Sequence, residues 1–291
     1  MRTVIITGAN SGLGFETAKK IAKNKEYAVI LACRNMDKAN AAVKEIKAAT
    51  GNENVTGMLI DTASLNSVRL FAKNYNEEVY GKVYALLLNA GISGMHEGIT
   101  EDGMDIVFQT NHLGHFLLAN LMMPHMEESG KIFSTTSDMH DSPMGKMKWT
   151  GTETLAHPGT DPSMARMRYS YSKLCNIYFV HELAKKLEQH NSGIRVNAFN
   201  PGFMQTNFAK VTKTMSAMVE HIMPKRFGDL EKSSDALAEL VVNDTLAVSS
   251  ANYYDRSINT CESSELSYNE DNASELWKAS EKLCGLNVNN Q

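Results

Sequence analysis

The chain has 291 residues, of which 43% are hydrophobic and 21% are charged, and its formal net charge is −4. A globular chain of this length can bury a large core and fits one α/β domain. Lys and Arg form no long run, so the sequence argues against nucleic-acid binding, which normally shows as a basic stripe.

The four cysteines are far apart and show neither a C-x-x-C pair nor the spacing of a zinc site. We therefore expect a reduced, intracellular protein without a bound metal. The first residues form a short apolar run with no signal-peptide pattern, and no stretch approaches the ~18 apolar residues of a membrane span. These features predict a cytoplasmic protein with no membrane span.

In chain order, short β-branched runs alternate with helical patterns through the first two-thirds of the sequence. The predicted strands cover residues 3–7, 28–32, 55–60, 83–88, 131–135 and 194–199. The predicted helices cover residues 15–23, 37–49, 66–78, 103–126 and 167–190. Such alternation predicts an α/β fold, a three-layer doubly wound parallel sheet of the Rossmann type, in a single domain over residues 1–291.

Two stretches interrupt this alternation and are candidate substrate lids. Residues 138–168 separate a strand from its helix by far more than the usual ~2–6 residues, and residues 203–229 are rich in methionine. Long insertions at the carboxyl ends of parallel strands often cover a ligand. Their methionines are Met139, Met144, Met147, Met164, Met167, Met204, Met215, Met218 and Met223. Flexible thioethers suit an adaptable apolar pocket, although ordinary filling of a loop–helix interface remains an alternative.

The first strand is followed by a glycine-rich turn that opens into a helix. The candidate nucleotide-binding residues are Gly8, Asn10, Ser11, Gly12, Leu13 and Gly14. Glycines let the backbone turn tightly and approach a pyrophosphate, and a helix N-terminus supplies N–H groups and a positive dipole. Thr17 breaks the usual G-x-G-x-x-G spacing, so the position of the turn after a buried strand carries the prediction.

The second strand ends with an arginine where an NAD-specific site usually has an acidic residue for the ribose 2′-OH. Arg34 occupies that place, and Lys38 follows one helical turn later. A guanidinium can bind a 2′-phosphate through two parallel hydrogen bonds. The pair predicts NADP rather than NAD, since a mere surface arginine would leave the missing carboxylate unexplained.

Tyr169 and Lys173 lie four residues apart at the start of a predicted helix, and so on one helical face. An unperturbed tyrosine has a pKa near ~10 and exchanges protons poorly at neutral pH. A neighbouring ammonium favours the phenolate and lowers that pKa. The spacing therefore predicts an acid–base pair that serves a carbonyl or an alcohol.

Taken together, these motifs resemble the short-chain dehydrogenase/reductase family across roughly residues 1–210. The matching pieces are Thr7-Gly8-x-x-x-Gly12-x-Gly14, Asp61, Asn89-Ala90-Gly91, Asn111, Ser137, Tyr169-x-x-x-Lys173 and Pro201-Gly202. The resemblance implies an oxidoreductase that transfers hydride between a nicotinamide cofactor and a carbonyl or alcohol carbon of a small-molecule substrate. With Arg34 and Lys38 the expected cofactor is NADP(H), and with the methionines the expected substrate has a sizeable apolar body.

The resemblance also implies a role for each catalytic residue. Tyr169 would exchange a proton with the substrate oxygen, and Ser137 would hydrogen-bond the same oxygen. Lys173 would lower the pKa of Tyr169 and bind the nicotinamide ribose, while Asn111 would hold a water that links Lys173 to solvent. Thr136 is an alternative to Ser137, which fits the family register better. Further residues implied to face the cofactor are Asp61, Thr62, Asn89, Ala90, Gly91, Pro201, Gly202 and Thr206.

Residues 33–35, 111–116 and 169–176 resemble the branch that holds retinol dehydrogenases and light-dependent protochlorophyllide reductases, and residues 273–286 resemble the tail of the latter. Phe203 stands where that reductase has a cysteine. The tail makes light-driven reduction of a C=C bond in a tetrapyrrole one alternative, against which Phe203 argues, and a non-catalytic NADP-binding sensor or scaffold is another.

The resemblance leaves the oligomeric state open. The family often forms homodimers through its two long helices, whereas the insertion before Tyr169 resembles that of monomeric carbonyl reductases, where it covers that surface. His112 and His115 lie three residues apart on one predicted helix without a suitably spaced partner, and we expect them to pack inside the fold rather than bind a metal.

Overall fold

The computed structural model of the chain describes residues 1–142, 146–159, 162–203 and 228–286, with backbone alone for residues 162–166. In this part of the chain a single sheet of eight strands has the order β3-β2-β1-β4-β5-β6-β7-β8. The strands are β1 (Arg2–Thr7), β2 (Tyr27–Cys33), β3 (Val55–Leu59), β4 (Val83–Leu88), β5 (Met126–Thr135), β6 (Arg195–Asn200), β7 (Tyr253–Asp255) and β8 (Thr260–Cys261). All neighbours pair parallel except β7 and β8, which pair antiparallel.

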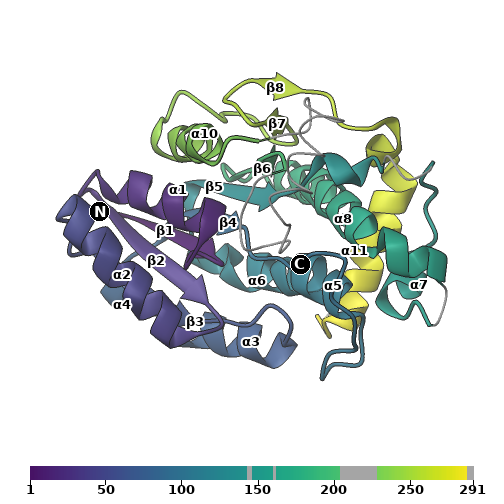
Figure 1. Cartoon of the computed structure of the whole chain (residues 1–291). Helices are drawn as coiled ribbons and strands as arrows, with labels where there is room; N and C mark the ends of the chain where they lie inside the picture. The colour runs from purple at the N-terminus through teal and green to yellow at the C-terminus, as the bar shows by residue number, and fades with distance from the viewer. Residues whose placement is uncertain (143–145, 160–161, 204–227, 287–291) are drawn as a thin grey trace.

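Helices cover both faces of this sheet, as Figure 1 shows. One face packs against α1 (Gly12–Ala22), α2 (Met36–Thr50) and α10 (Leu230–Val242). The other packs against α3 (Leu65–Asn74), α6 (Gly114–Met122), α8 (Pro162–Gln189) and α11 (Glu270–Leu283). The central strands β1, β2 and β4 are buried along nearly their whole length, and their sequences are accordingly almost continuous apolar runs. The predicted three-layer Rossmann fold is confirmed, with the antiparallel β8 as an addition at one edge.

The long helix predicted over residues 103–126 is divided in the structure. It begins only after Asp105, whose Oδ1 accepts hydrogen bonds from the N–H groups of Val107 and Phe108, and α5 covers Ile106–Phe108. One π-helical turn, η1 (Gln109–Leu113), then leads into α6. Turns of this type often lie at functional sites because the wider turn re-aims side chains and backbone carbonyls.

Other helix limits also differ from the prediction. The predicted helix over residues 66–78 divides into α3 and α4 (Glu77–Tyr80), because Asn76 begins a new helix by accepting from the N–H of Glu78. A 3₁₀ turn, η2 (Met123–His125), follows α6, and α8 starts at Pro162, five residues before its predicted start.

The first predicted lid is partly helical. It contains the 3₁₀ turn η3 (Asp138–His140) and α7 (Thr152–Ala156). Its Met147 is buried and Met167 packs against the core, so these two methionines fill an interior interface. The second predicted lid, including Thr206, lies outside the described residues apart from its ends, and so do Met144 and the side chain of Met164.

The last quarter of the chain, for which the sequence predicted no elements, completes the sheet and one helical layer. After α10 come β7, β8, a 3₁₀ turn η5 (Glu265–Tyr268) and α11. Figure 1 shows α11 beside α8. Among the helices that the structure describes, none is both long and apolar enough to cross a membrane.

Candidate active site

The glycine turn after β1 lies directly against the backbone that follows β4. Gly8 has a φ of +67°, and a Cβ at this position would stand 3.0 Å from the Cα of Ala90. A Cβ on Gly14 would stand 2.6 Å from Nδ2 of Asn89. Both positions therefore require glycine, one for its φ and for space, the other for space alone.

Thr7 joins the two loops through its hydroxyl. Its Oγ1 accepts hydrogen bonds from the backbone N–H groups of Asn89 (2.8 Å) and Ala90 (2.9 Å), and Asn89 Nδ2 donates to the Thr7 carbonyl at 2.8 Å. Since β1 and β4 are parallel neighbours, the glycine turn and the residues Asn89–Gly91 form one surface at their carboxyl ends. In α/β sheets with this topology such a surface is where dinucleotides bind.

The N-terminus of α1 at this surface suits a phosphate group. Gly12, its first residue, has a φ of +58°. Within the described residues, the N-cap Ser11 makes no side-chain hydrogen bond to the helix. The first-turn N–H groups of a helix need partners from outside the helix, and a pyrophosphate supplies them. Asn10 and Leu13 lie in the same turn, the former half-buried and the latter buried.

Four more of the predicted cofactor residues lie at the carboxyl ends of β2 and β3. Arg34 and Lys38 are exposed where β2 leads into α2. Asp61 and Thr62 follow β3, and the Asp61 carboxylate accepts from the N–H of Ala63 at 2.9 Å. Predicted cofactor residues therefore follow four adjacent strands at one edge of the sheet, and this row of residues fits an extended dinucleotide.

Ser137 and Tyr169 meet through their side chains. Ser137 follows β5, and its hydroxyl is hydrogen-bonded to the phenol of Tyr169 on α8. Ser137 Oγ also accepts from the N–H of Met139 at 3.2 Å. The hydroxyl of Thr136 instead donates to the backbone carbonyl of Lys173 at 3.0 Å in the interior. Of the two candidates, Ser137 is therefore the one in contact with the tyrosine.

Lys173 is buried beside the same tyrosine. Its Nζ donates to the carbonyl of Thr135 at 3.0 Å and lies 5.5 Å from the centre of the Tyr169 ring. Removal from water disfavours the ammonium and lowers the pKa of Lys173 to about 8.

The pKa of Tyr169 differs from the sequence-based expectation. The sequence predicted that Lys173 would lower it, but burial raises the pKa of Tyr169 to about 12 and outweighs the opposing effect of the hydrogen bond from Ser137. Desolvation disfavours the phenolate more than one neutral donor favours it. The phenol is therefore protonated at neutral pH.

Asn111 lies in the π-helical turn and ties three segments together. Its Oδ1 accepts from the N–H of Ile92 at 2.8 Å, while Nδ2 donates to the Ile92 carbonyl and to Ser172 Oγ, each at 3.0 Å. These bonds use the amide to hold the loop after β4 against α8. Both N–H groups of Nδ2 are used, so a water bound at Asn111, as the family resemblance implies, would donate to Oδ1 or to the backbone carbonyl, which also accepts from His115 Nδ1 at 3.2 Å.

Both histidines of this helix pack inside the fold. His115 Nε2 is 2.9 Å from Thr7 Oγ1, so this ring connects the glycine turn to Asn111. His112 Nε2 is 3.1 Å from Ser280 Oγ on α11. Burial lowers the pKa of each to about 3, so both are neutral at pH 7. In the ranges that the structure describes, no group of three or more His, Cys, Asp or Glu side chains could hold a metal.

Sequence reasoning missed Gly94, which lies against Tyr169. A Cβ on Gly94 would stand 3.0 Å from the Cβ of Tyr169. The signal was a second glycine three residues after Gly91, in a loop that follows a buried strand. The sequence predicted that His115 packs inside the fold but not that it links the glycine turn to Asn111, because Thr7 is 108 residues away in the sequence.

Pro201 and Gly202 follow β6, which is the neighbour of β5, the strand that Ser137 follows. Gly202 has a φ of +76°, and its N–H donates to Asn200 Oδ1 at 2.9 Å. Asn200 Nδ2 in turn donates to the carboxylates of Asp138 (2.7 Å) and Asp255 (2.8 Å). This network fixes the Pro201–Gly202 turn relative to the residue that follows Ser137.

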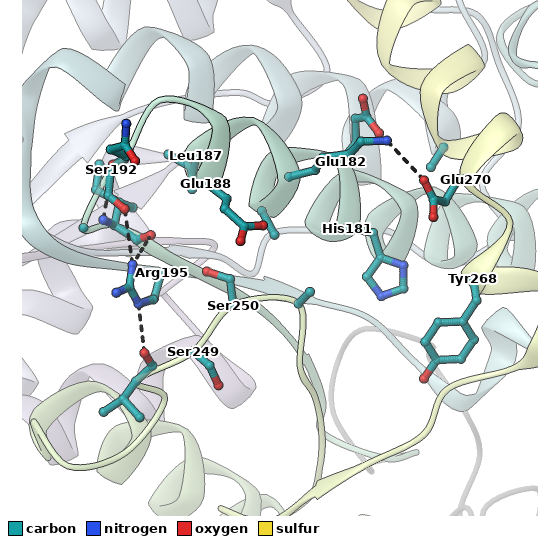
Figure 2. A pocket seen from close by; sticks show the side chains of 18 of the residues that line it. His181, Glu182, Leu187, Glu188, Ser192, Arg195, Ser249, Ser250, Tyr268 and Glu270 are labelled. Carbon is teal, nitrogen blue, oxygen red and sulfur yellow. Dashed lines mark hydrogen bonds and ion pairs between the residues drawn. The ribbon is translucent and has the colours of Figure 1, made fainter.

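A wide hollow of about 1000 Å³ lies at the other end of the sheet (Figure 2). It is bordered by the last turns of α8, the start of β6 at Arg195 and the first residues of α11. Arg195 Nε donates to the Val248 carbonyl at 2.9 Å, and Lys185 forms an ion pair with Glu270 across the opening. Because the predicted site residues follow the carboxyl ends of the strands, this hollow is separate from the candidate active site.

A sequence profile of the short chain dehydrogenases matches residues 2–149 and 155–217. The chain belongs to the short chain dehydrogenase family. As a member of it, the protein is an oxidoreductase that uses a nicotinamide cofactor, either NAD or NADP.

Curated relatives of this short chain dehydrogenase include retinol dehydrogenases. Human retinol dehydrogenase 13 is 34% identical over 98% of the chain and 85% of that protein, and mouse retinol dehydrogenase 11 is 32% identical over 99% and 87%. The WW domain-containing oxidoreductase of Gallus gallus is 40% identical over 70% of the chain but 49% of its own length. The resemblance to the retinol dehydrogenase branch is thereby confirmed.

Solved structures share the fold of this short chain dehydrogenase. An uncharacterized protein from Mycobacterium paratuberculosis superposes with a TM-score of 0.71 at 28% identity, over 98% of this chain and 94% of the other. An actinorhodin polyketide ketoreductase variant, solved with NADPH, gives a TM-score of 0.66 at 21% identity, over 87% and 95%. At that identity the second likeness bears on the fold alone.

Proposed function

We propose that the protein is a cytoplasmic, NADP(H)-dependent short chain dehydrogenase that transfers hydride between the nicotinamide and a carbonyl or alcohol carbon of a largely apolar substrate. The observation that carries the proposal is the hydrogen bond between Ser137 and Tyr169, with the buried Lys173 ammonium 5.5 Å from the tyrosine ring. These three groups supply a proton, a second hydrogen-bond donor and a positive charge at one point.

When bound, the cofactor supplies or accepts the hydride, and the residues of the chain handle the proton. In the direction of reduction, Tyr169 donates its proton to the substrate oxygen as negative charge develops there. Ser137 donates a second hydrogen bond to the same oxygen, and such positioned donors are among the strongest contributors to catalysis. A phenol that is protonated at neutral pH is ready for this direction.

The preference for NADP rests on charge at the end of β2. Arg34 and Lys38 are exposed at the point where a 2′-phosphate would lie. A phosphate accepts charge-assisted hydrogen bonds from a guanidinium. Replacement by Arg34→Asp is expected to weaken NADPH binding by about tenfold or more, since a hydrogen bond to a charged group contributes ~1.5–3 kcal/mol, and to leave NADH binding less affected.

The apolar substrate class is supported by the relatives of the chain. Those that cover most of it are named retinol dehydrogenases, and retinol is an apolar alcohol. We therefore expect long-chain or cyclic apolar aldehydes and ketones to react better than small, charged ones.

The test is NADPH oxidation, followed by absorbance in the dark, with a panel of apolar aldehydes, ketones and retinal. We expect turnover in the wild type and loss of it in Tyr169→Phe, which keeps the ring and removes the proton. Turnover limited to small charged carbonyls would contradict the apolar class.

The same assay separates the alternatives. A rate that rises on illumination with a tetrapyrrole and is absent in the dark would favour light-driven C=C reduction. NADPH binding with no turnover under either condition would favour a non-catalytic sensor or scaffold.

A further inference from the structure

His140 connects the turn that carries Ser137 to the C-terminal part of the chain. It is the last residue of η3, and only 6% of it is exposed to solvent. Its Nδ1 lies 2.7 Å from the carbonyl of Ser137, and its Nε2 lies 3.0 Å from the backbone nitrogen of Ser264. Ser264 is 124 residues further along the chain, immediately before η5.

The partners determine which ring nitrogen carries the proton. A carbonyl oxygen only accepts, so Nδ1 donates to Ser137. A backbone N–H only donates, so Nε2 accepts from Ser264. One neutral imidazole therefore satisfies both bonds, and its orientation is fixed from two sides.

The bond to Ser137 acts on the backbone that aims the Ser137 hydroxyl. The Ser137 carbonyl accepts from Nδ1 of His140 and also from its N–H at 2.9 Å. Within the same turn, Ser137 Oγ accepts from the N–H of Met139 and meets Tyr169. A shift of the His140 ring therefore shifts the turn that fixes the position of the hydroxyl.

The second side of the ring is held by the C-terminal segment. Tyr253 of β7 packs on it with ring centroids 5.3 Å apart. Ser264 itself belongs to a short turn in which its carbonyl accepts from the N–H of Ser267 at 3.0 Å. The Ser264 N–H that donates to Nε2 therefore belongs to a hydrogen-bonded turn.

We propose that His140 is a positioning residue through which the segment at Ser264 holds the catalytic hydroxyl of Ser137 toward Tyr169. The proposal rests on the function assigned above to Ser137. It makes the C-terminal segment, which lies outside the part of the chain matched by the family profile, a determinant of the chemical step.

Ser264 offers a substitution that removes one hydrogen bond and little else. Its φ of −68° and ψ of 151° are those of proline, so Ser264→Pro deletes the N–H while the backbone conformation is kept. Ser264→Ala is the matched control because it keeps the N–H. The Ser264 hydroxyl, which this control removes, has no hydrogen-bond partner among the residues that the structure describes.

Two substitutions of His140 each keep one of its two hydrogen bonds and remove the other. In His140→Asn the amide can still donate to the Ser137 carbonyl from the place of Nδ1 but cannot reach Ser264. In His140→Gln the amide oxygen can accept from Ser264 but leaves the Ser137 carbonyl without its side-chain donor. If both bonds are needed, both variants lose activity.

The measurement is kcat, KM and the NADPH dissociation constant of the full-length variants, after thermal melting has shown that each is folded. We expect kcat to fall by about tenfold in Ser264→Pro and His140→Asn, less than the ~10²–10³-fold that follows loss of an oxyanion donor. NADPH binding and Ser264→Ala should match the wild type. Because both substitutions remove the same bond, the double variant should be no slower than either single one.

A readout that does not depend on turnover distinguishes this proposal from the proposed function. The Met139 amide donates to Ser137 Oγ, and its hydrogen exchange reports whether the turn is held. Faster exchange in Ser264→Pro and His140→Asn than in Ser264→Ala supports the proposal even if no substrate is turned over, in which case only the proposed function fails. Equal exchange in all variants, or wild-type kcat in Ser264→Pro, overturns it.

Discussion

The phenol of Tyr169 is held in its protonated form by burial, which raises its pKa to about 12. Reduction of a carbonyl uses the protonated phenol, and oxidation of an alcohol uses the phenolate. We therefore predict that the reduction rate is constant across neutral pH and falls as pH rises toward the pKa of Tyr169. The oxidation rate should rise with pH over the same interval.

The buried Lys173 adds a second feature to these pH profiles. Its pKa is lowered to about 8, so its ammonium is lost above pH 8, and the phenolate is then no longer favoured by a neighbouring positive charge. The increase in the oxidation rate should flatten above this pH. Initial rates in both directions between pH 6 and pH 10 test the prediction. In this interval the reduction rate should stay nearly constant, because the phenol remains protonated, and a reduction rate that rises with pH would be inconsistent with Tyr169 as the proton donor.

Gly94 leaves the space that the Tyr169 side chain occupies. A Cβ there would stand 3.0 Å from Tyr169 Cβ, so Gly94→Ala must displace the tyrosine by a few tenths of an ångström. Since small misplacements of reacting groups are costly to catalysis, we predict a lower kcat with NADPH binding unchanged. Gly98→Ala is the control, because nothing lies within 4 Å of its added methyl, although its own φ of +137° carries some backbone strain. Equal kcat in both variants would remove Gly94 from the account.

At the residue scale, motif spacing located groups that the structure brings into contact. Tyr169 and Lys173 follow from helical periodicity, and Ser137 from its place after a strand. The pKa of Tyr169 could not be predicted, because it depends on burial by segments distant in sequence. The partner of His140, 124 residues away, was inaccessible for the same reason.

Among the contacts between elements, Lys131 links β5 to the end of α10. It is 5% exposed, and its Nζ donates to the carbonyls of Leu240 (2.9 Å), Asn243 (2.9 Å) and Leu246 (3.1 Å). The last carbonyls of a helix lack partners within it, and a cation there also interacts favourably with the helix dipole.

Lys131→Met keeps most of the side-chain volume and removes these bonds. Each hydrogen bond to a charged donor contributes ~1.5–3 kcal/mol, and buried carbonyls left unpaired add a desolvation cost, while removal of a buried charge offsets part of the loss. We predict that the free energy of unfolding falls by about 2–4 kcal/mol. Chemical denaturation measures it, with Lys44→Met at an exposed position of α2 as control, and equal stabilities would contradict the assigned role.

The sequence predicts the boundaries of helices and strands only where a local signal, such as a change of apolar pattern, is clear. The first four strands, β6 and the first two helices were predicted to within a few residues, whereas β5 begins five residues earlier than predicted and β7 and β8 were not predicted. The division of the helix over residues 103–126 was not, because the hydrogen bonds of Asn111 to Ile92 and Ser172 depend on packing that an apolar periodic sequence does not display.

At the scale of the whole molecule, α11 determines which helical surface remains free. Trp277 lies 4.8 Å from Phe116 of α6 and stacks with Phe179 of α8 at 6.1 Å between ring centroids. The Trp277 side chain is 3% exposed. The two long helices through which the family often pairs are thus covered by the chain itself.

We therefore predict a monomer in solution. Light scattering during size-exclusion chromatography should give a mass near the 32.2 kDa of the chain at micromolar concentration. A stable mass of twice that value would show that another surface forms a dimer. The sequence left monomer and homodimer open because the path of the last quarter of the chain, and with it the position of α11, was not predicted.

The central claim is that hydride passes between NADP(H) and a carbonyl carbon while Tyr169 supplies the proton. The most direct measurement is the transfer of deuterium from NADPH that carries two deuterium atoms on the reactive carbon of the nicotinamide, analysed by mass spectrometry of the product. We expect one deuterium on the former carbonyl carbon with the wild type, and none with Tyr169→Phe although that variant still binds NADPH. Deuterium transfer at the wild-type rate by Tyr169→Phe, or an unlabelled product from the wild type, would contradict it.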